Sequence, residues 1–354
     1  MSNKVVKIQE FLNLGEAALV TSGENRFYLT GFPSSAGTVL VTKQKAYFLI
    51  DFRYFEKAKK TVTSCEVILA EKGGVSVLDL LGKENIKKLF VETEKTSVAE
   101  FKGMKEKYGE VLTESDEFDK YITRCREIKD EKELALIREA QKLTDDTFSY
   151  ILERIEAGRT EKEVMLDMEF YMRKLGSEGV SFDFIVVSGK NSSLPHGVPT
   201  DKVIEKGDFL TMDFGAVVGG YHSDMTRTVA VGEASDEMKL IYNTVARAQG
   251  ESFKLIKAGA NCFDVDKASR DVIYGAGFEG CYGHGLGHSV GVEIHEEPRF
   301  SPACNRILET GMVMTVEPGI YLEDKFGVRI EDMVFVTDDG YENITKSDKK
   351  LIIL

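Results

Sequence analysis

The sequence of 354 residues lacks several features that would define whole classes of protein. No apolar run approaches the roughly 18 residues that a membrane-spanning helix needs, and the first segment, MSNKVVKIQEFLNL, has no secretory apolar core. Positive charge is in the minority, since 46 Lys and Arg face 59 Asp and Glu and the formal net charge is −13. This charge disfavours nucleic acids and anionic membrane surfaces as partners. We therefore expect a cytoplasmic protein that binds neither.

Cysteine is also scarce. The five cysteines are odd in number and widely scattered, which favours reduced thiols over a disulfide framework. Cys281 lies three residues before His284, a spacing that suggests zinc, but we expect a small buried residue there.

The composition predicts two domains with substantial cores, because 42% of the residues are hydrophobic and 10% are aromatic. Strand-like runs (KAYFLID, CEVILA, KKLFVE) alternate with helix-like runs (FRYFEKAKK, SVLDLLGKE, SVAEFKGMKEKYG) in the N-terminal part. This pattern predicts an α/β domain over residues 1–120. A charged linker, residues 121–129, should precede a C-terminal domain, residues 130–354. That domain should open with a long amphipathic helix ending near Gly158, followed by a capping box at Thr160 and Glu163.

The C-terminal part contains an internal duplication. IEAGRTEKEV, from Ile155, aligns without gaps with IKAGANCFDV, from Ile256. Further on, GDFLTMDFG aligns with GMVMTVEPG, which places Asp213 on Glu317, and Asp224 then falls on Glu331. We expect two helix and strand units related by a pseudo-twofold axis, each supplying two carboxylates to a shared centre.

Four carboxylates and one histidine in these glycine-rich segments form a candidate set of metal ligands: Asp213, Asp224, His288, Glu317 and Glu331. A lone acidic residue of this kind is most often a turn residue, but matched placement in two repeats favours metal binding. Two divalent ions about 3.5 to 4 Å apart repel each other, so the ligands must carry nearly matching negative charge and some must bridge. Oxygen-rich ligation with one imidazole suits manganese, although cobalt, zinc and iron also accept such ligands. Bound cations activate water, so hydrolysis of a carbonyl-type bond follows.

The histidines provide a second group of candidates. All five lie in the C-terminal half of the chain, and two of them stand in the motif HGLGH. Four nearby glycines argue against a helix there, so His284 and His288 need not share a metal. We expect one of them to be a ligand and the other to contact substrate, and we expect His222 to be structural.

The chain resembles the creatinase and aminopeptidase P superfamily, the pita-bread metallopeptidases of family M24, which include prolidase, aminopeptidase P and methionine aminopeptidase. The motifs that carry this resemblance are LPHGVP, MDFG, YHSDMTRT, GHGLGHSVGVEIHEEP, TVEPGIY and GVRIED, in this order, over about residues 130 to 340. NRFYLTGF and LIDFRYFEKAKK resemble the N-terminal, creatinase-like domain of the proline-specific branch. The implied fold is α/β, or α+β, with a C-terminal pita-bread domain.

The resemblance also implies roles for single residues. Two divalent ions would be held by Asp213, Asp224, His288, Glu317 and Glu331, with Asp224 and Glu331 bridging. Glu317 matches the family glutamate that also shuttles the proton from the attacking water to the leaving amine. Pocket residues that steady the carbonyl or tetrahedral oxygen would be His196, His284 and His295. Arg329 resembles an arginine that fixes a carboxylate ligand or grips a substrate carboxylate, using its planar donor fork. Tyr321 resembles an active-site tyrosine, although strand packing explains it equally well.

The implied activity is hydrolysis of the bond between an N-terminal residue and proline, as in Xaa-Pro dipeptidases and Xaa-Pro aminopeptidases. An Xaa-Pro bond has no N–H, so a centre that polarises the carbonyl and protonates the leaving nitrogen suits it. The N-terminal domain, HGLGH and Arg329 favour this activity over that of methionine aminopeptidases, which share the five ligands. The same fold also supports non-catalytic interaction modules and metal-free creatinase chemistry, and the five ligand positions argue against both. Relatives of this kind are usually homodimers, which sets the expected oligomeric state.

Overall fold

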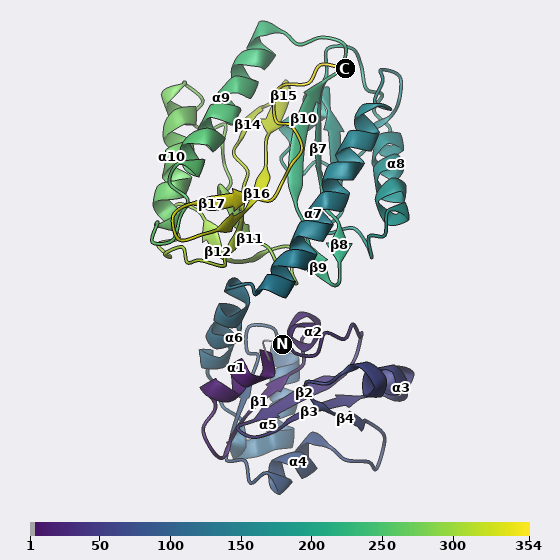
Figure 1. Cartoon of the computed structure of the whole chain (residues 1–354), viewed down its shortest axis with the longest axis vertical. Coiled ribbons are helices and arrows are strands. Elements are labelled where there is room, and N and C mark those ends of the chain that lie inside the picture. Colours follow the sequence, from purple (N-terminus) through teal and green to yellow (C-terminus); the bar gives the residue numbers. More distant parts are fainter. Residues whose placement is uncertain (1–3) are drawn as a thin grey trace. The chain divides into compact units, whose positions relative to one another are not determined.

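The computed structural model describes residues 4–354, which form two compact units (Figure 1). The first unit ends at Arg126 and the second begins at Glu127. Most of the expected linker, residues 121–129, is helical, because it belongs to helix α6 (Glu117–Glu127). None of the helices within residues 4–354 is long and apolar enough to cross a membrane.

The N-terminal unit is built around a mixed five-stranded sheet in the order β4-β3-β2-β1-β5. The strands β1 and β5, and likewise β3 and β4, are parallel, and the other neighbours are antiparallel. The strands are β1 (Glu16–Val20), β2 (Thr38–Thr42), β3 (Ala46–Ile50), β4 (Glu66–Leu69) and β5 (Lys88–Val91). The helices are α1 (Lys4–Phe11), α2 (Gly23–Thr30), α3 (Phe52–Thr61), α4 (Val77–Lys83), α5 (Val98–Tyr108), the 3₁₀ turn η1 (Gly109–Val111) and α6. All six strand-like and helix-like runs read from the sequence of this unit have the predicted type.

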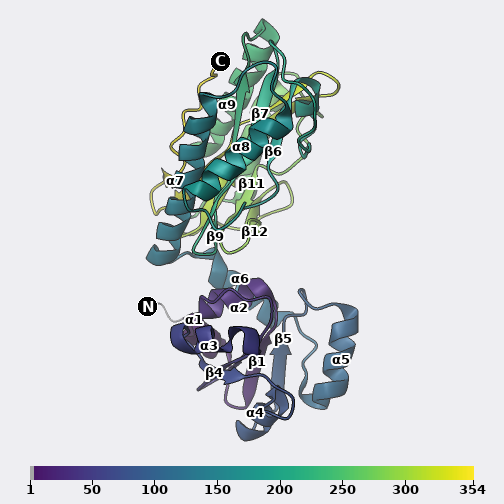
Figure 2. The same cartoon turned by 90° about the vertical axis from the view of Figure 1, so that its right-hand side faces the viewer.

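The C-terminal unit repeats one order of elements twice. Its first half contains α7 (Glu131–Leu152), α8 (Glu161–Lys174), β6 (Ile185–Ser188), η2 (Gly189–Ser193), β7 (Phe209–Phe214), β8 (Val217–Val218), β9 (Tyr221–His222) and β10 (Met225–Ala230). Its second half contains α9 (Asp236–Phe253), α10 (Cys262–Gly275), β11 (Gly287–Ser289), β12 (Glu296–Phe300), β13 (Val313–Val316), β14 (Gly319–Leu322), β15 (Phe326–Arg329), β16 (Asp332–Val336) and β17 (Tyr341–Asn343). Helices α7 and α8 lie on one side of the strands and α9 and α10 on the other (Figures 1 and 2).

The strand pairing has the same topology in both halves. The order β10-β7-β6 in the first half matches β16-β13-β11 within the five-stranded sheet β12-β11-β13-β16-β17 of the second. The central strands β7, β10 and β13 are buried along their whole length. The duplication predicted from the self-alignment is therefore present as two halves with the same strand order.

Three sequence details have different outcomes. The capping box is confirmed, since the Thr160 hydroxyl accepts from the backbone of Glu163 and the Glu163 carboxylate accepts from the backbone of Thr160. Helix α7 ends at Leu152, not near Gly158, and residues 153–154 form a turn after it. All five cysteines are free thiols, but Cys281 is only partly buried, because it packs at the edge of a core cluster.

Candidate metal centre

The five candidate ligands lie on or beside strands, and the four carboxylates among them occupy equivalent places in the two halves. Asp213 lies in β7 and Asp224 immediately before the neighbouring strand β10. Glu317 directly follows β13, and Glu331 immediately precedes its neighbour β16. His288 lies in β11. All five line one cavity of about 910 Å³.

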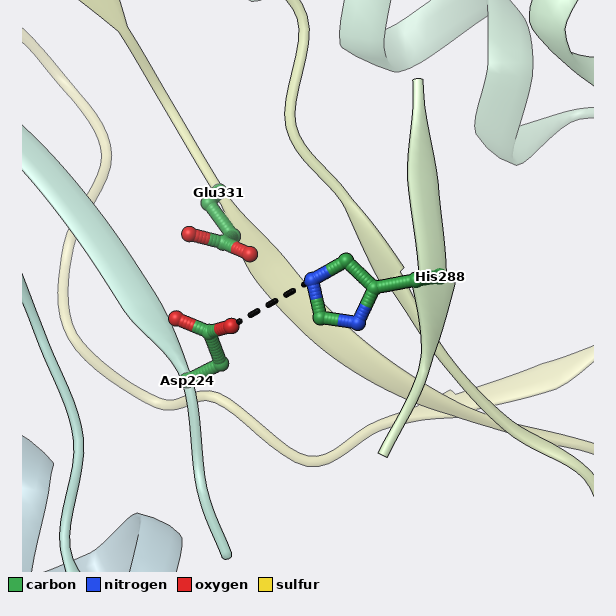
Figure 3. A group of neighbouring side chains, drawn as sticks. All are labelled: Asp224, His288 and Glu331. Carbon is green, nitrogen blue, oxygen red and sulfur yellow. Dashed lines mark ion pairs between the residues drawn. The ribbon is translucent and has the colours of Figure 1, made fainter. Parts of the chain in front are cut away.

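Four of the five ligand candidates are joined by short distances. Ligand atoms of Asp224, His288 and Glu331 lie within 4.8 Å of one another, and Figure 3 shows these side chains pointing toward a common point from different strands. His288 Nε2 lies 3.5 Å from Asp224 Oδ2 and 3.6 Å from Glu317 Oε1. Asp213 is held differently, because its Oδ2 accepts a hydrogen bond from Arg329 at 2.6 Å.

Several oxygens in this group lack a hydrogen-bond partner within the described residues. They are Asp213 Oδ1, Asp224 Oδ1 and Glu331 Oε1, and all three are fully buried. A buried polar atom without a hydrogen-bond partner lowers the stability of the folded state by about 1 to 7 kcal/mol. Because the oxygens are carboxylate oxygens that face one cavity with an imidazole, divalent cations are the partners that fit them.

The acidic groups also repel each other. Burial, followed by the repulsion of neighbouring carboxylates, raises the pKa of Asp224 and that of Glu331 well above the ordinary range. Burial raises the pKa of Glu317 to about 8, with Asp213 adding to the shift and Arg329 opposing it. Because burial and mutual repulsion disfavour the ionised carboxylates, a bound cation would stabilise this cluster.

The tautomer of His288 is fixed by the backbone. Its Nδ1 lies 3.1 Å from the Ser289 carbonyl oxygen, which can only accept, so Nδ1 carries the proton and the Nε2 lone pair faces Asp224 and Glu317. Burial lowers the pKa of His288 to about 3. The ring is therefore neutral and has the form that a metal ligand requires.

Arg329 is the buried centre of a hydrogen-bond network behind the carboxylates. Besides Asp213, its guanidinium donates to the hydroxyls of Thr226 at 3.0 Å and Tyr321 at 2.8 Å. Thr226 in turn donates to Glu331 Oε2 at 2.7 Å. One arginine thus orients a carboxylate from each half of the duplication.

Tyr321 extends this network to His284. The tyrosine hydroxyl, which accepts from Arg329, donates to His284 Nε2 at 3.0 Å. His284 Nδ1 donates to the carbonyl of Gly285 at 2.8 Å. Burial lowers the pKa of His284 to about 4, so the ring is neutral. Both of its nitrogens are engaged, and Tyr321 has a polar contact in addition to strand packing.

His196 and His295 line the cavity directly. The His295 ring meets the His288 ring edge to face at 4.5 Å, and burial lowers the pKa of His295. His222 instead shares a hydrogen bond between Nδ1 and the Ser181 hydroxyl at 2.9 Å, in keeping with a structural residue.

Two residues of this site were not foreseen from the sequence. Thr226 lies two residues after Asp224 on the same face of the hairpin, and this strand alternation was the available signal. Arg299 lines the cavity, and its side chain is 52% exposed. Its Nε lies 3.4 Å from Glu297 Oε1. It follows His295 by four residues, but no local pattern marks it as a pocket residue.

Comparison with known proteins places this geometry in a family context. The model of metallopeptidase family M24 matches residues 135–338, and that of the creatinase/prolidase N-terminal domain matches residues 15–128. An uncharacterized peptidase, YqhT, of Bacillus subtilis is 43% identical over 96% of each chain. The structure of an Xaa-Pro dipeptidase from Bacillus anthracis is 41% identical, with a TM-score of 0.93 over 99% of each chain. That of an X-Pro aminopeptidase from Thermotoga maritima is 35% identical, with a TM-score of 0.89 over 98% of this chain and 100% of the other.

Proposed function

The chain belongs to metallopeptidase family M24, and from this premise we propose that it is a dinuclear Xaa-Pro peptidase acting on dipeptides. The observation that carries the proposal is the set of buried carboxylate oxygens without hydrogen-bond partners among the described residues, facing a neutral imidazole nitrogen across one cavity. Such a set favours two divalent cations, and its many oxygens favour manganese. The Xaa-Pro dipeptidases among the similar proteins support the Xaa-Pro bond as the target.

The proposed ligands are Asp213, Asp224, His288, Glu317 and Glu331. When bound, two such ions would polarise the scissile carbonyl and lower the pKa of water. The carboxylates of Asp224 and Glu331 are close enough to other carboxylates for repulsion to raise their pKa values. The negative charge of the four carboxylates together would nearly balance the charge of two divalent cations.

Glu317 is the best candidate for moving the proton. Its side chain is 18% exposed to the cavity, against 6% for Asp224 and 8% for His288. It can therefore take a proton from attacking water and deliver it to the nitrogen of proline, which needs that proton to leave as an amine. His295 and His196 line the cavity, where an imidazole N–H can donate to the carbonyl oxygen.

Arg299 supports a dipeptide rather than a longer peptide. The carboxylate of an Xaa-Pro dipeptide lies only one residue from the scissile bond, so it must be matched by a cation inside the cavity. Arg329 is already engaged with Asp213, whereas the half-exposed guanidinium of Arg299 is accessible to a substrate. A planar guanidinium binds a carboxylate with two parallel hydrogen bonds.

The test is a comparison of three substrates with manganese-loaded protein: an Xaa-Pro dipeptide, the same dipeptide as its amide, and a Met-Ala dipeptide. We expect turnover of the first, weak turnover of the amide and none of Met-Ala. Arg299→Met should raise KM for the free dipeptide by about 10-fold or more while leaving the amide unchanged. Preference for Met-Ala would instead indicate a methionine aminopeptidase, and a folded chain that binds no metal would indicate an interaction module.

The expected homodimer remains a prediction. Analytical ultracentrifugation of the full chain at two concentrations tests it directly.

A further inference from the structure

Lys129 is a buried cation close to the metal centre that has no part in the proposed chemistry. It lies between the end of α6 and the beginning of α7, and its side chain is 1% exposed. Its Nζ donates to the hydroxyl of Ser289 at 2.8 Å and to Glu296 Oε2 at 3.1 Å. These partners are 160 and 167 residues away along the chain.

The two partners of Lys129 form the base of one loop. Ser289 ends β11 and Glu296 begins β12, and they are opposite each other in the antiparallel pair. The register shifts between His288 and Ser289, and such a bulge re-aims the side chain beside it. One ammonium group therefore holds both ends of the loop, residues 290–295, that joins the two strands.

A cavity histidine stands next to each of the two partners of Lys129. His288 precedes Ser289, and His295 precedes Glu296. The two imidazole rings are in contact at 4.5 Å. A displacement of either strand at the base of the loop would separate them.

The loop is also folded closely around the Glu296 carboxylate. The backbone N–H of Glu293 donates to Glu296 Oε1 at 3.2 Å, and a Cβ at Gly291 would lie 2.5 Å from Glu296 Oε2. Because the carboxylate is enclosed by backbone, its charge needs a balancing cation, and Lys129 supplies it.

We propose that Lys129 is a positioning residue: by tethering Ser289 and Glu296 it fixes the loop so that His288 and His295 keep their places at the metal centre. Its effect on metal binding is independent of substrate, whereas its effect on turnover rests on the proposed function. Replacing a buried ion pair by neutral groups of similar shape changes stability little, so the tether can be separated from folding.

The experiment compares wild-type protein with the double variant Lys129→Met/Glu296→Gln, which removes both charges together. The measurements are Tm, Mn²⁺ affinity by isothermal titration calorimetry, and kcat/KM for an Xaa-Pro dipeptide. We expect a Tm close to that of the wild type, with Mn²⁺ affinity and kcat/KM each reduced by about 10-fold or more. Ser289→Ala, a smaller change that keeps the ion pair, should weaken Mn²⁺ binding without lowering Tm.

The matched control is Glu127→Gln/Arg306→Met, which removes the ion pair between these two residues at 2.7 Å. Glu127 lies two residues before Lys129, but neither Glu127 nor Arg306 belongs to the loop. It should leave Mn²⁺ affinity and kcat/KM unchanged. If both Lys129→Met/Glu296→Gln and Ser289→Ala bind Mn²⁺ as the wild type does, the positioning role is wrong. A wild-type protein that binds Mn²⁺ but cleaves no Xaa-Pro peptide would refute the proposed function instead, and the Mn²⁺ measurements would still decide the role of Lys129.

Discussion

Removal of metal should give this protein a stability that falls as pH rises, because three buried carboxyl groups have raised pKa values. They belong to Asp224, Glu317 and Glu331. In the folded chain without metal, Glu317, with its pKa of about 8, keeps most of its protons at neutral pH, and Asp224 and Glu331 hold theirs to a higher pH than they do in the unfolded chain. Raising the pH therefore favours the unfolded state, and the loss continues until the pH passes the folded pKa.

The size of the effect follows from the pKa of Glu317, which burial raises to about 8. Between about pH 7 and about pH 8.5, one such group lowers the free energy of unfolding by about 1 kcal/mol. For a unit of this size that corresponds to a Tm lower by about 2 to 4 °C. Asp224 and Glu331 act in the same direction. The pKa values of His284 and His288 are lowered to about 4 and about 3, so the stability they contribute is complete above pH 7.

Differential scanning calorimetry of EDTA-treated and Mn²⁺-saturated protein at these two pH values measures the effect. Bound cations replace the protons, so the Mn²⁺-saturated Tm should vary little and the rise on adding Mn²⁺ should be larger at the higher pH. Glu317→Gln, which removes the titrating group at nearly constant size, should raise the metal-free Tm at the higher pH and reduce the gain from Mn²⁺. A metal-free Tm that is constant or rises with pH in the wild type would refute the reasoning.

Three further changes test the site. Glu331→Gln should lose at least one metal ion per chain and essentially all turnover, as measured by plasma mass spectrometry and peptide assay; full metal content with activity would remove it from the ligands. Arg329→Ala should retain both ions at saturating Mn²⁺ but lower kcat/KM by about 10- to 100-fold, because Asp213 loses its hydrogen-bond donor; unchanged kinetics would contradict this. Gly287→Ala should abolish metal binding, since a Cβ there would lie 2.1 Å from the Thr315 carbonyl oxygen. Gly283→Ala, where a Cβ meets nothing within 4 Å, is its control and should bind Mn²⁺ normally.

The duplication and the candidate ligands were predictable because the sequence carries them locally. A strand that ends in an acidic residue followed by glycine, repeated after about a hundred residues, needs no knowledge of distant contacts to be recognised. The structure indeed brings Asp213, Asp224, Glu317 and Glu331 to one cavity with His288. The beginning of α8 was also predictable, because a capping box is written within four consecutive residues.

The supporting contacts could not be predicted in the same way. Arg329 meets Thr226 103 residues away, and Lys129 meets Glu296 167 residues away. Such partners depend on how distant segments of the chain pack against each other. The periodicity of a single segment carries no information about that packing. The end of α7 was missed because no proline or glycine directly follows Leu152, where the helix ends.

The duplication accounts for the symmetry of the carboxylates, and its departures make the two halves contribute different residues to the cavity. Strand β6 occupies in the first half the place that β11 occupies in the second, since each pairs with a strand, β7 or β13, that contains or directly precedes an acidic ligand candidate. In β6 all four positions are buried and mainly apolar, whereas β11 carries His288 and its neighbour β12 carries Arg299. The first half therefore adds several apolar residues to the cavity, including Ile185, whereas these strands of the second half add the imidazole of His288 and the guanidinium of Arg299. If the substrate is a dipeptide, as we propose, its side chain and its carboxylate would meet chemically different residues in the cavity, and this difference would set its orientation.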